Sequence, residues 1–486
     1  MTHPVSTGDD RSAASVFAEL PEVRQVPDAR ERIRRSHAAT GRRIAVLDDD
    51  PTGSQSVHHV SVVTVLDEVE YATALDVAAA TCFILTNTRS LPAAAAVELT
   101  SGVARSLFQL ADRLGAPIDV VSRSDSTLRG HVVEEVRVLD ATRRAVSGRG
   151  YDGILLAPAY FEAGRFTAGD IHWARIGDRL VPVGETEFAA DATFGYQSSN
   201  LRDFVAEKSG GELSPAEVHS IALDDIRLGG PERVAEILSA VAEGAFVVVN
   251  ATDYADYEIV VLGLLQVEEA GRSFVYRTGP SFVRALTGQE PQPPLTARAI
   301  WPQGHPGGHG LVVVGSHVGL TSRQVAAAQQ RGGLTEIELD VARLTDAASA
   351  DAHVAETTRR VRSALAESDV LLYTSRTRVR GADADASLAI ARTVSTAVTS
   401  VVRNALTARP AWVVAKGGIT SHDVAVRGLG IRRAEVLGQL LPGMVSVLLP
   451  REAAPEAVGK PYVVFAGNVG NENTLADVVA LFSAPT

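Results

Sequence analysis

Residues 43–55 read RIAVLDDDPTGSQ, a short apolar run that ends in three consecutive carboxylates and a Pro-Thr-Gly turn. The apolar run is typical of a buried strand, and a core has no room for the charged side chains that follow it. In an open parallel sheet, ligands bind in the crevice outside the carboxyl ends of the strands. The stretch therefore predicts a parallel α/β sheet with candidate site residues at Asp48, Asp49 and Asp50. The alternative is a solvated acidic turn, because Asp, Pro and Gly are the usual turn residues.

The composition is that of a globular protein with more than one domain. The 486 residues exceed the size that one core supports, and 45% of them are hydrophobic and 21% charged. The net charge of −12 argues against nucleic acid or an anionic membrane as the main partner. The single cysteine, Cys82, can form neither an internal disulfide nor a CxxC motif. With no apolar leader and no stretch of membrane-spanning length, the sequence predicts a cytoplasmic protein.

Apolar runs rich in β-forming residues alternate along the chain with Ala-rich segments of helical spacing. This alternation predicts βαβ units and mostly parallel sheets. Residues 289–309 are rich in Pro and Gly, as linkers are. We therefore predict an N-terminal tail and helix over 1–40, a first domain over 41–288, a linker over 289–309 and a second domain over 310–486. Each domain is expected to be a mostly parallel sheet flanked by helices. Residues 178–230 are less regular, and their sequence assigns no chemistry to them.

Three further strands of the first half also end in polar clusters. These clusters read TNTRS at 86–90, SRSDSTLRGH at 122–131 and PAYFEAGR at 158–165. Together with the acidic stretch they place four polar loops at the carboxyl ends of strands, which predicts a pocket for a small polar ligand. Arg123, Arg129 and Arg165 suit a carboxylate or phosphate, because a guanidinium group binds either one in bidentate fashion.

Three strands of the second half end in turns of small residues, at Gly315-Ser316, at 415–421 (AKGGITS) and at 466–471 (AGNVGN). Glycine lets a backbone approach a ligand closely, and free amides at a helix N-terminus bind anions. Three such turns at one sheet edge indicate a cradle for nucleotide phosphates. The pattern matches neither a P-loop nor a dinucleotide fingerprint. His58-His59, and His131 with Glu134, lack a third ligand, so we expect no dedicated transition-metal site.

Taken together, these motifs resemble those of the four-carbon acid sugar kinase family. In chain order they are LDDDPTG at 47–53, TNTR at 86–89, RSDSTLRGH at 123–131, GRFT at 164–167, Gly315-Ser316, KGGITS at 416–421 and GNVG at 467–470. The similarity spans residues 43 to about 480. Family members use ATP to phosphorylate the terminal hydroxyl of acids such as erythronate, threonate or 3-oxo-tetronate. The resemblance implies a sugar-acid domain, then a nucleotide domain, with the active site in the interdomain cleft. Pro51 and Gln55 depart from the pattern of better-known members, which leaves the exact substrate open.

The resemblance also implies roles for single residues, assigned by what phosphoryl transfer requires, an oriented hydroxyl and neutralised phosphates. We hypothesise that Asp49 or Asp125 accepts the proton of the substrate hydroxyl. The residues expected to bind the sugar acid are Asp48, Asp50 and Thr52 for its other hydroxyls or a metal, and Arg123, Arg129, Ser124 and Ser126 for its carboxylate.

The expected nucleotide site uses the small-residue turns. The backbone of four glycines is expected to approach the phosphates or ribose: Gly417, Gly418, Gly467 and Gly470. Ser316 and Thr420 are expected to donate to phosphate oxygens, and Asn468 is expected in the same cofactor site. Lys416 either neutralises phosphate or is a salt-bridged surface lysine at a strand end. ATP is the expected cofactor, with Mg²⁺ held mainly by its phosphate oxygens.

Two other classes of function stay open at this point. Acidic clusters facing a basic loop also fit a metal-dependent lyase or aldolase-like enzyme on four-carbon acids. A non-catalytic sugar-acid-binding regulatory protein would bind the acid and transfer nothing. The expected partners are a small-molecule sugar acid and ATP, without nucleic acid or membrane, and a homodimer is left open.

Overall fold

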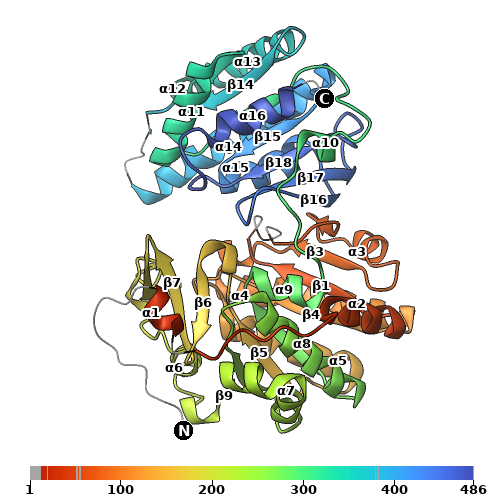
Figure 1. Ribbon diagram of the computed structural model, residues 1–486. Coiled ribbons are helices and arrows are strands. Elements are labelled where there is room, and N and C mark those ends of the chain that lie inside the picture. The colour runs from red at the N-terminus through yellow and green to blue at the C-terminus, as the bar shows by residue number, and fades with distance from the viewer. Residues whose placement is uncertain are drawn as a thin grey trace. The chain divides into compact units, whose positions relative to one another are not determined.

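The computed structural model describes residues 13–18, 20–50, 53, 56–346, 348–377, 379 and 383–484. Contacts divide the chain into two compact units. The first comprises Met1–Val57 and Leu66–Pro291, and the second comprises His58–Val65 and Gln292–Thr486. Figure 1 shows the strands and helices of both units. No helix in these described ranges is long and apolar enough to cross a membrane.

The first unit is built on a parallel sheet with the strand order β3-β1-β4-β11-β5-β10-β9. The strands are β1 (Arg43–Asp48), β3 (Thr81–Leu85), β4 (Ile118–Arg123), β5 (Gly153–Ala157), β9 (His219–Ile221), β10 (Ala245–Val249) and β11 (Phe274–Thr278). Every residue of β1, β3 and β5 is buried. Such continuous burial explains the unbroken apolar runs in the sequence, because a parallel sheet is covered on both faces.

Helices flank this sheet in two groups that pack among themselves (Figure 1). One group joins α4 (Ala93–Leu114) to α5 (Val132–Ser147), and the other joins α8 (Tyr254–Glu269) to α2 (Ala29–Thr40), α7 (Gly230–Ser239) and α9 (Pro280–Leu286). The remaining helices are α1 (Ala13–Ala18), α3 (Glu68–Ala74) and α6 (Leu201–Lys208). A small antiparallel sheet holds β6 (Arg165–Ala168), β7 (Ile171–Ile176) and β8 (Arg179–Pro182). Residues 178–230 thus supply β8, α6 and β9.

The second unit contains a mixed sheet with the order β13-β14-β12-β15-β18-β17-β16-β2. The strands from β13 to β18 in this order run parallel, and β17, β16 and β2 are antiparallel to their neighbours. Their bounds are β2 (Ser61–Val63), β12 (Leu311–Val314), β13 (Leu334–Leu339), β14 (Asp369–Thr374), β15 (Val413–Lys416), β16 (Arg433–Leu441), β17 (Val445–Glu452) and β18 (Tyr462–Phe465). The helices are α10 (Ala297–Ile300), α11 (Gly319–Arg331), α12 (Val341–Thr345), α13 (Ala350–Ala364), α14 (Ala384–Ala405), α15 (Gly418–Asp423) and α16 (Thr474–Ser483). Trp412, Trp301 and Phe482 lie in its core.

The predicted α/β architecture of two domains with mostly parallel sheets is confirmed. One segment runs differently from the sequence prediction, which placed all of 41–288 in the first domain. Residues His58–Val65 belong to the second unit, where β2 pairs with β16 through Ser61, Val62 and Val63. Strand β2 has only three residues, which are too few for a periodic pattern that would assign the strand to either sheet.

Candidate functional site

The acidic stretch after β1 is buried rather than solvated. Asp48 lies beside Arg123 in the register of β1 with β4, and Arg123 Nη1 donates to Asp48 Oδ1 at 2.8 Å. The same Nη1 lies 4.0 Å from Asp49 Oδ1. Asp48, Asp49 and Arg123 are 0%, 2% and 5% exposed. This burial rules out the solvated-turn alternative. The ion pairs also join the two predicted acids to Arg123, one of the predicted arginines.

A hydrogen-bonded chain of polar side chains holds Asp49. Ser124 Oγ donates to Asp49 Oδ2 at 2.7 Å, and Arg277 Nη2 donates to Ser124 Oγ at 2.7 Å. Arg277 also donates to Ser122 Oγ at 2.6 Å and forms an ion pair with Glu135. Sequence reasoning missed Arg277 and Glu135. The signal for Arg277 is a charged residue directly after the apolar run 274–276.

Asp125 lies in a turn after β4 and is surrounded by cations. Arg129 Nε donates to Asp125 Oδ2 at 2.6 Å, the Thr127 hydroxyl also donates to it, and Arg89 Nη1 lies 3.6 Å from Oδ1. Arg89 pairs with Asp50 as well, so it bridges two of the predicted acids. Arg89 stands within the quoted TNTR motif but was not among the predicted site residues.

Glycine is required at the end of this turn. Gly130 has φ +121°, a conformation that residues with a Cβ rarely adopt. A Cβ there would lie 3.1 Å from both Asp49 Oδ2 and Arg277 Nη2. The motif glycine therefore leaves room for the Asp49 network.

Electrostatics separate the two predicted proton acceptors. Burial raises the pKa of Asp48 to about 7 against the opposing effect of Arg123, and it raises the pKa of Asp49 against Arg89 and Arg277. Burial acts on Asp125 too, but Arg89 and Arg129 outweigh it and hold the pKa of that carboxyl below its usual value. Asp48 Oδ2 and Asp49 Oδ1 are buried and have no hydrogen-bond partner among the residues that the structure describes. Asp49 thus fits a proton acceptor better than Asp125 does.

Of the other predicted residues of this half, the structure describes Ser126 but not Thr52. Ser126 is buried, and its carbonyl oxygen lies 2.8 Å from His172 Nε2. Thr52 lies outside the described residues, as do Pro51 and Gln55.

The small-residue turns of the second unit come together because β12, β15 and β18 are adjacent strands. A Cβ on Gly315 would lie 2.3 Å from Thr420 Oγ1, and one on Gly467 would lie 2.6 Å from Ser316 Oγ. Gly417 has φ +122°, and its added Cβ would lie 3.1 Å from Thr420 Oγ1. Glycine at these three positions therefore lets the loops approach one another more closely than side chains would allow.

The remaining predicted residues of this half lie nearby with fewer contacts. Gly418 begins α15, and an added Cβ there would have no neighbour within 4 Å. Asn468 is exposed. Gly470 packs on Thr474 at the start of α16, where an added Cβ would lie 2.5 Å from Thr474 Oγ1.

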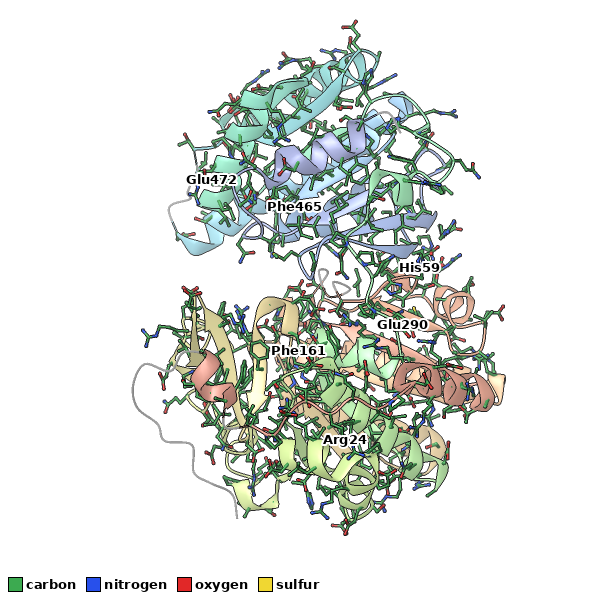
Figure 2. The ribbon with its side chains drawn as sticks, in the orientation of Figure 1. Arg24, His59, Phe161, Glu290, Phe465 and Glu472 are labelled. Carbon is green, nitrogen blue, oxygen red and sulfur yellow. The ribbon has the colours of Figure 1, made fainter. Side chains whose placement is uncertain are left out.

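Lys416 is a buried lysine at the end of β15. Its Nζ donates to the carbonyl of Ala466 at 2.7 Å and lies 3.6 Å from the ring centroid of Phe465, which Figure 2 labels. Lys416 is 0% exposed, and burial lowers its pKa to about 7. The expectation of a salt-bridged surface lysine is therefore wrong. The amine lies beside the glycine turns. An anion bound there would stabilise the charged form of Lys416.

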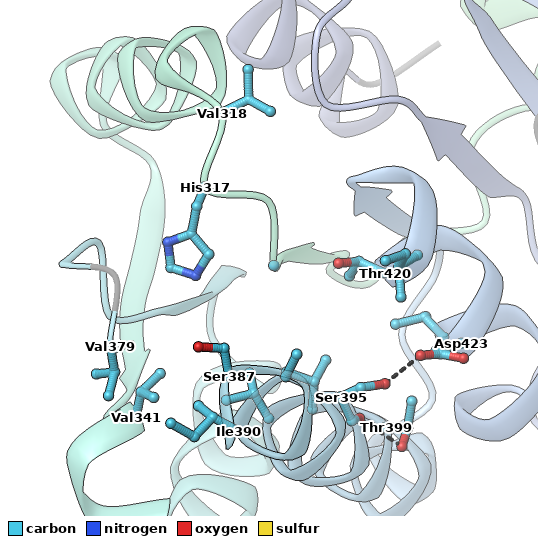
Figure 3. Close-up of a pocket in the computed structure, with 16 residues that line it drawn as sticks. His317, Val318, Val341, Val379, Ser387, Ile390, Ser395, Thr399, Thr420 and Asp423 are labelled. Carbon is cyan, nitrogen blue, oxygen red and sulfur yellow. Dashed lines mark hydrogen bonds between the residues drawn. The ribbon is translucent and has the colours of Figure 1, made fainter. Parts of the chain in front are cut away.

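A cavity of about 530 Å³ opens beside these turns (Figure 3). Its apolar wall comes from Val341 and from Ile390, Val394 and Val398 of α14. Gly315 and Thr420 line the side nearest the glycine turns. Asp423 faces the cavity as well and accepts a hydrogen bond from Ser395.

Arg376 is a cation at this end that the sequence prediction missed. Its Nη2 donates to the carbonyl of Ser316 at 2.6 Å, while its Nε and Nη1 are buried without a hydrogen-bond partner in the described part of the chain. The signal was the polar cluster Thr374-Ser375-Arg376-Thr377 at the end of β14, the same pattern that identified the loops of the first half.

No group of three or more His, Cys, Asp or Glu side chains in the described ranges is arranged to hold a metal ion.

Two family models match the chain. A sugar-binding N-terminal domain matches residues 44–286, and a nucleotide-binding C-terminal domain matches residues 311–475. The chain therefore consists of a sugar-binding N-terminal domain and a nucleotide-binding C-terminal domain. The chain belongs to the family that joins these two domains, the DUF1537-type or four-carbon acid sugar kinase family, as the sequence resemblance indicated. No curated protein sequence matches the chain significantly.

Solved structures share the fold at low sequence identity. A Salmonella typhimurium LT2 protein, described as a candidate tRNA synthase, is 17% identical with a TM-score of 0.67, over 90% of this chain and 98% of the other. A Haemophilus influenzae protein of the DUF1537 family is 17% identical with a TM-score of 0.62, over 90% of this chain and 100% of the other. At this identity the likeness concerns the fold alone.

Proposed function

We propose that the protein is an ATP-dependent kinase that phosphorylates a hydroxyl, by resemblance the terminal one, of a four-carbon sugar acid such as erythronate, threonate or 3-oxo-tetronate. The matches to a sugar-binding and a nucleotide-binding domain support one ligand of each kind. The observation that carries the proposal is Asp49, a buried carboxylate with a raised pKa and an oxygen that accepts no hydrogen bond from a described residue.

Asp49 is the proposed general base. Ser124 Oγ donates to one carboxylate oxygen, and the other, which accepts no hydrogen bond from a described residue, is assigned to the substrate hydroxyl. A raised pKa suits the task, because a base works best when its pKa lies near the operating pH. Asp125, with its pKa held low by two arginines, is proposed to anchor Arg89 and Arg129 rather than to take the proton.

The substrate hydroxyl oxygen bonds to the γ-phosphorus of ATP, and the bond from that phosphorus to the bridging oxygen breaks. ADP leaves with the bridging oxygen, and the hydroxyl proton passes to Asp49. Such a transfer depends mainly on positioning and on neutralising charge. It also requires the two ligands to meet, and the interdomain cleft that the resemblance implies stays a prediction.

The glycine turns of the second unit are proposed to hold the nucleotide. Gly315, Gly417 and Gly467 let backbone groups approach phosphates, and Arg376 and Lys416 supply positive charge there. The apolar cavity beside α14 suits a nucleobase, since ligand pockets are mostly apolar with a few polar groups. Mg²⁺ would be held mainly by the phosphate oxygens, with Asp423 as the carboxylate that lines this cavity.

The test is ADP release with ATP and Mg²⁺ across D- and L-erythronate, D- and L-threonate and their 3-oxo forms. We expect one acid to turn over and its epimers to react poorly. If no acid gives ADP although the protein binds ATP, the kinase proposal is wrong. Binding of an acid without any turnover would instead support the regulatory alternative, and cleavage of an acid without ATP would support the lyase alternative.

A further inference from the structure

The predicted carboxylate receptor needs revision, because Arg123 is already occupied. This side chain is 5% exposed, donates to Asp48 at 2.8 Å and lies near Asp49. A ligand carboxylate there would compete with two buried acids. The arginine that remains for a ligand must lie elsewhere around Asp125.

Arg165 is such an arginine. It begins β6 and is half-buried, and no carboxylate lies within ion-pairing distance of it among the described residues. Its Nη1 donates to the carbonyl of Ala163 at 2.6 Å, whereas its Nε is buried with no hydrogen-bond partner in the same ranges. An unpaired, partly buried guanidinium group is costly unless a ligand supplies the missing negative charge.

Arg165 and Arg129 share one aromatic ring. Both guanidinium carbons lie 5.4 Å from the ring centroid of Phe188, within the range of cation–π attraction. Arg129 donates to Asp125, so the ring gathers both cations beside the turn after β4. Asp125 and Asp191 already pair with Arg129, so the charge of Arg165 is the one that a ligand anion would neutralise.

The segment that carries Phe188 is fastened to the same turn. Tyr196 OH donates to the carbonyl of Thr127 at 2.7 Å. Phe194 packs edge-on against His131, with the two ring centroids 5.0 Å apart. Asp191 Oδ2 lies 3.7 Å from Arg129 Nη1. This segment belongs to residues 178–230, to which the sequence assigned no chemistry.

We propose that Arg165, which rests with Arg129 on Phe188, binds the carboxylate of the four-carbon sugar acid, with Phe188 as the positioning residue. This inference rests on the proposed function for the identity of the ligand. The charge of Arg165, which no described carboxylate pairs, distinguishes the acid from its neutral sugar alcohol. Arg165 supplies the unshared charge, and Asp125 keeps Arg129 in place.

The experiment is calorimetric titration of the full chain with erythronate, threonate and the neutral alcohol erythritol, in the absence of nucleotide. We expect wild-type protein to bind an acid and not the alcohol. Arg165→Met should weaken binding of the acid about tenfold or more, because it removes a charged hydrogen-bond donor. Phe188→Leu should weaken it less, and Phe188→Tyr, which keeps the ring, should restore it.

Arg175→Met is the matched control, since Arg175 rests on Phe166 at 5.3 Å in the same small sheet. It should bind the acid as wild type does. If Arg165→Met fails to fold, Arg165→Lys and Phe188→Leu carry the test, because lysine keeps the charge without the bidentate fork.

Acid binding by folded Arg165→Met at wild-type strength overturns the inference, whether or not the protein is a kinase. Failure of the wild-type protein to bind any of these acids overturns it as well. Acid binding that Arg165→Met loses, without ADP release by the wild type, leaves the inference standing and refutes the kinase.

Discussion

The two candidate sites differ in what they are made of. The sugar-binding end is a network of buried charges, in which Asp48, Asp49 and Arg123 are almost fully covered. The nucleotide-binding end relies on missing side chains, because Gly315, Gly417 and Gly467 allow loops to touch. On the proposed function, the first site would recognise its ligand through charge and protonation, and the second mainly through close backbone approach. Substitutions should therefore fail for different reasons at the two ends.

The largest expected effect is at Asp49. Asp49→Asn removes the proposed proton acceptor and should lower kcat by about 10²–10⁴-fold, the usual contribution of a general base. Affinity for ATP, measured by titration, should not change. Asp477→Asn, on an exposed carboxylate of α16 paired with Arg331, is the control and should turn over normally. Wild-type turnover by Asp49→Asn would show that charge at this end serves binding only.

The next largest effect should come from adding a methyl group at Gly417, in the nucleotide-binding domain. Gly417→Ala places a Cβ 3.1 Å from Ser316 Cβ at φ +122°, a strain of about 1–3 kcal/mol. We expect weaker ATP binding, with acid binding unchanged in calorimetry. Gly459→Ala is the control, because Gly459 also has positive φ but an added Cβ there meets nothing within 4 Å. Equal losses of ATP affinity in both variants would contradict a role for close approach at Gly417.

The last prediction concerns stability rather than ligand binding, and it is a pH dependence at Asp48. Its pKa is raised by burial to about 7, from an ordinary value of 3.8, so the folded state keeps its proton when the unfolded state has lost it. The unfolding free energy contributed by Asp48 should therefore fall as pH rises from about 4 to about 7 and stay level above that. Urea unfolding of wild type and Asp48→Asn across this range tests the expectation, since the difference between them isolates Asp48. A pH-independent difference would contradict the raised pKa.

Strand ends were readable from the sequence because charged side chains are almost never fully buried unless they are paired, so charges that end an apolar run mark a strand end or a polar site. That rule found Asp48, Asp49, Arg123 and Ser124, which the structure brings together, and the glycine turns of the second half. The same rule applied to the end of β14 would have found Arg376.

Other features gave no local signal. Glu135 looks like an ordinary charge in a helix, and only the fold shows that it accepts from Ser122 and pairs with Arg277. The pairing of β2 with β16 joins residues far apart in sequence. Protonation is also a tertiary property: Asp49 and Asp125 are both carboxylates after a strand, and their opposite pKa shifts come from which arginines surround each one.

The most direct test of the central claim follows the phosphorus itself. ³¹P NMR of the full chain with ATP, Mg²⁺ and the acid that binds most tightly should show a new phosphomonoester resonance that grows together with ADP. Appearance of ADP with inorganic phosphate alone, or no change in the ATP resonances with any acid of the panel, would contradict a sugar-acid kinase.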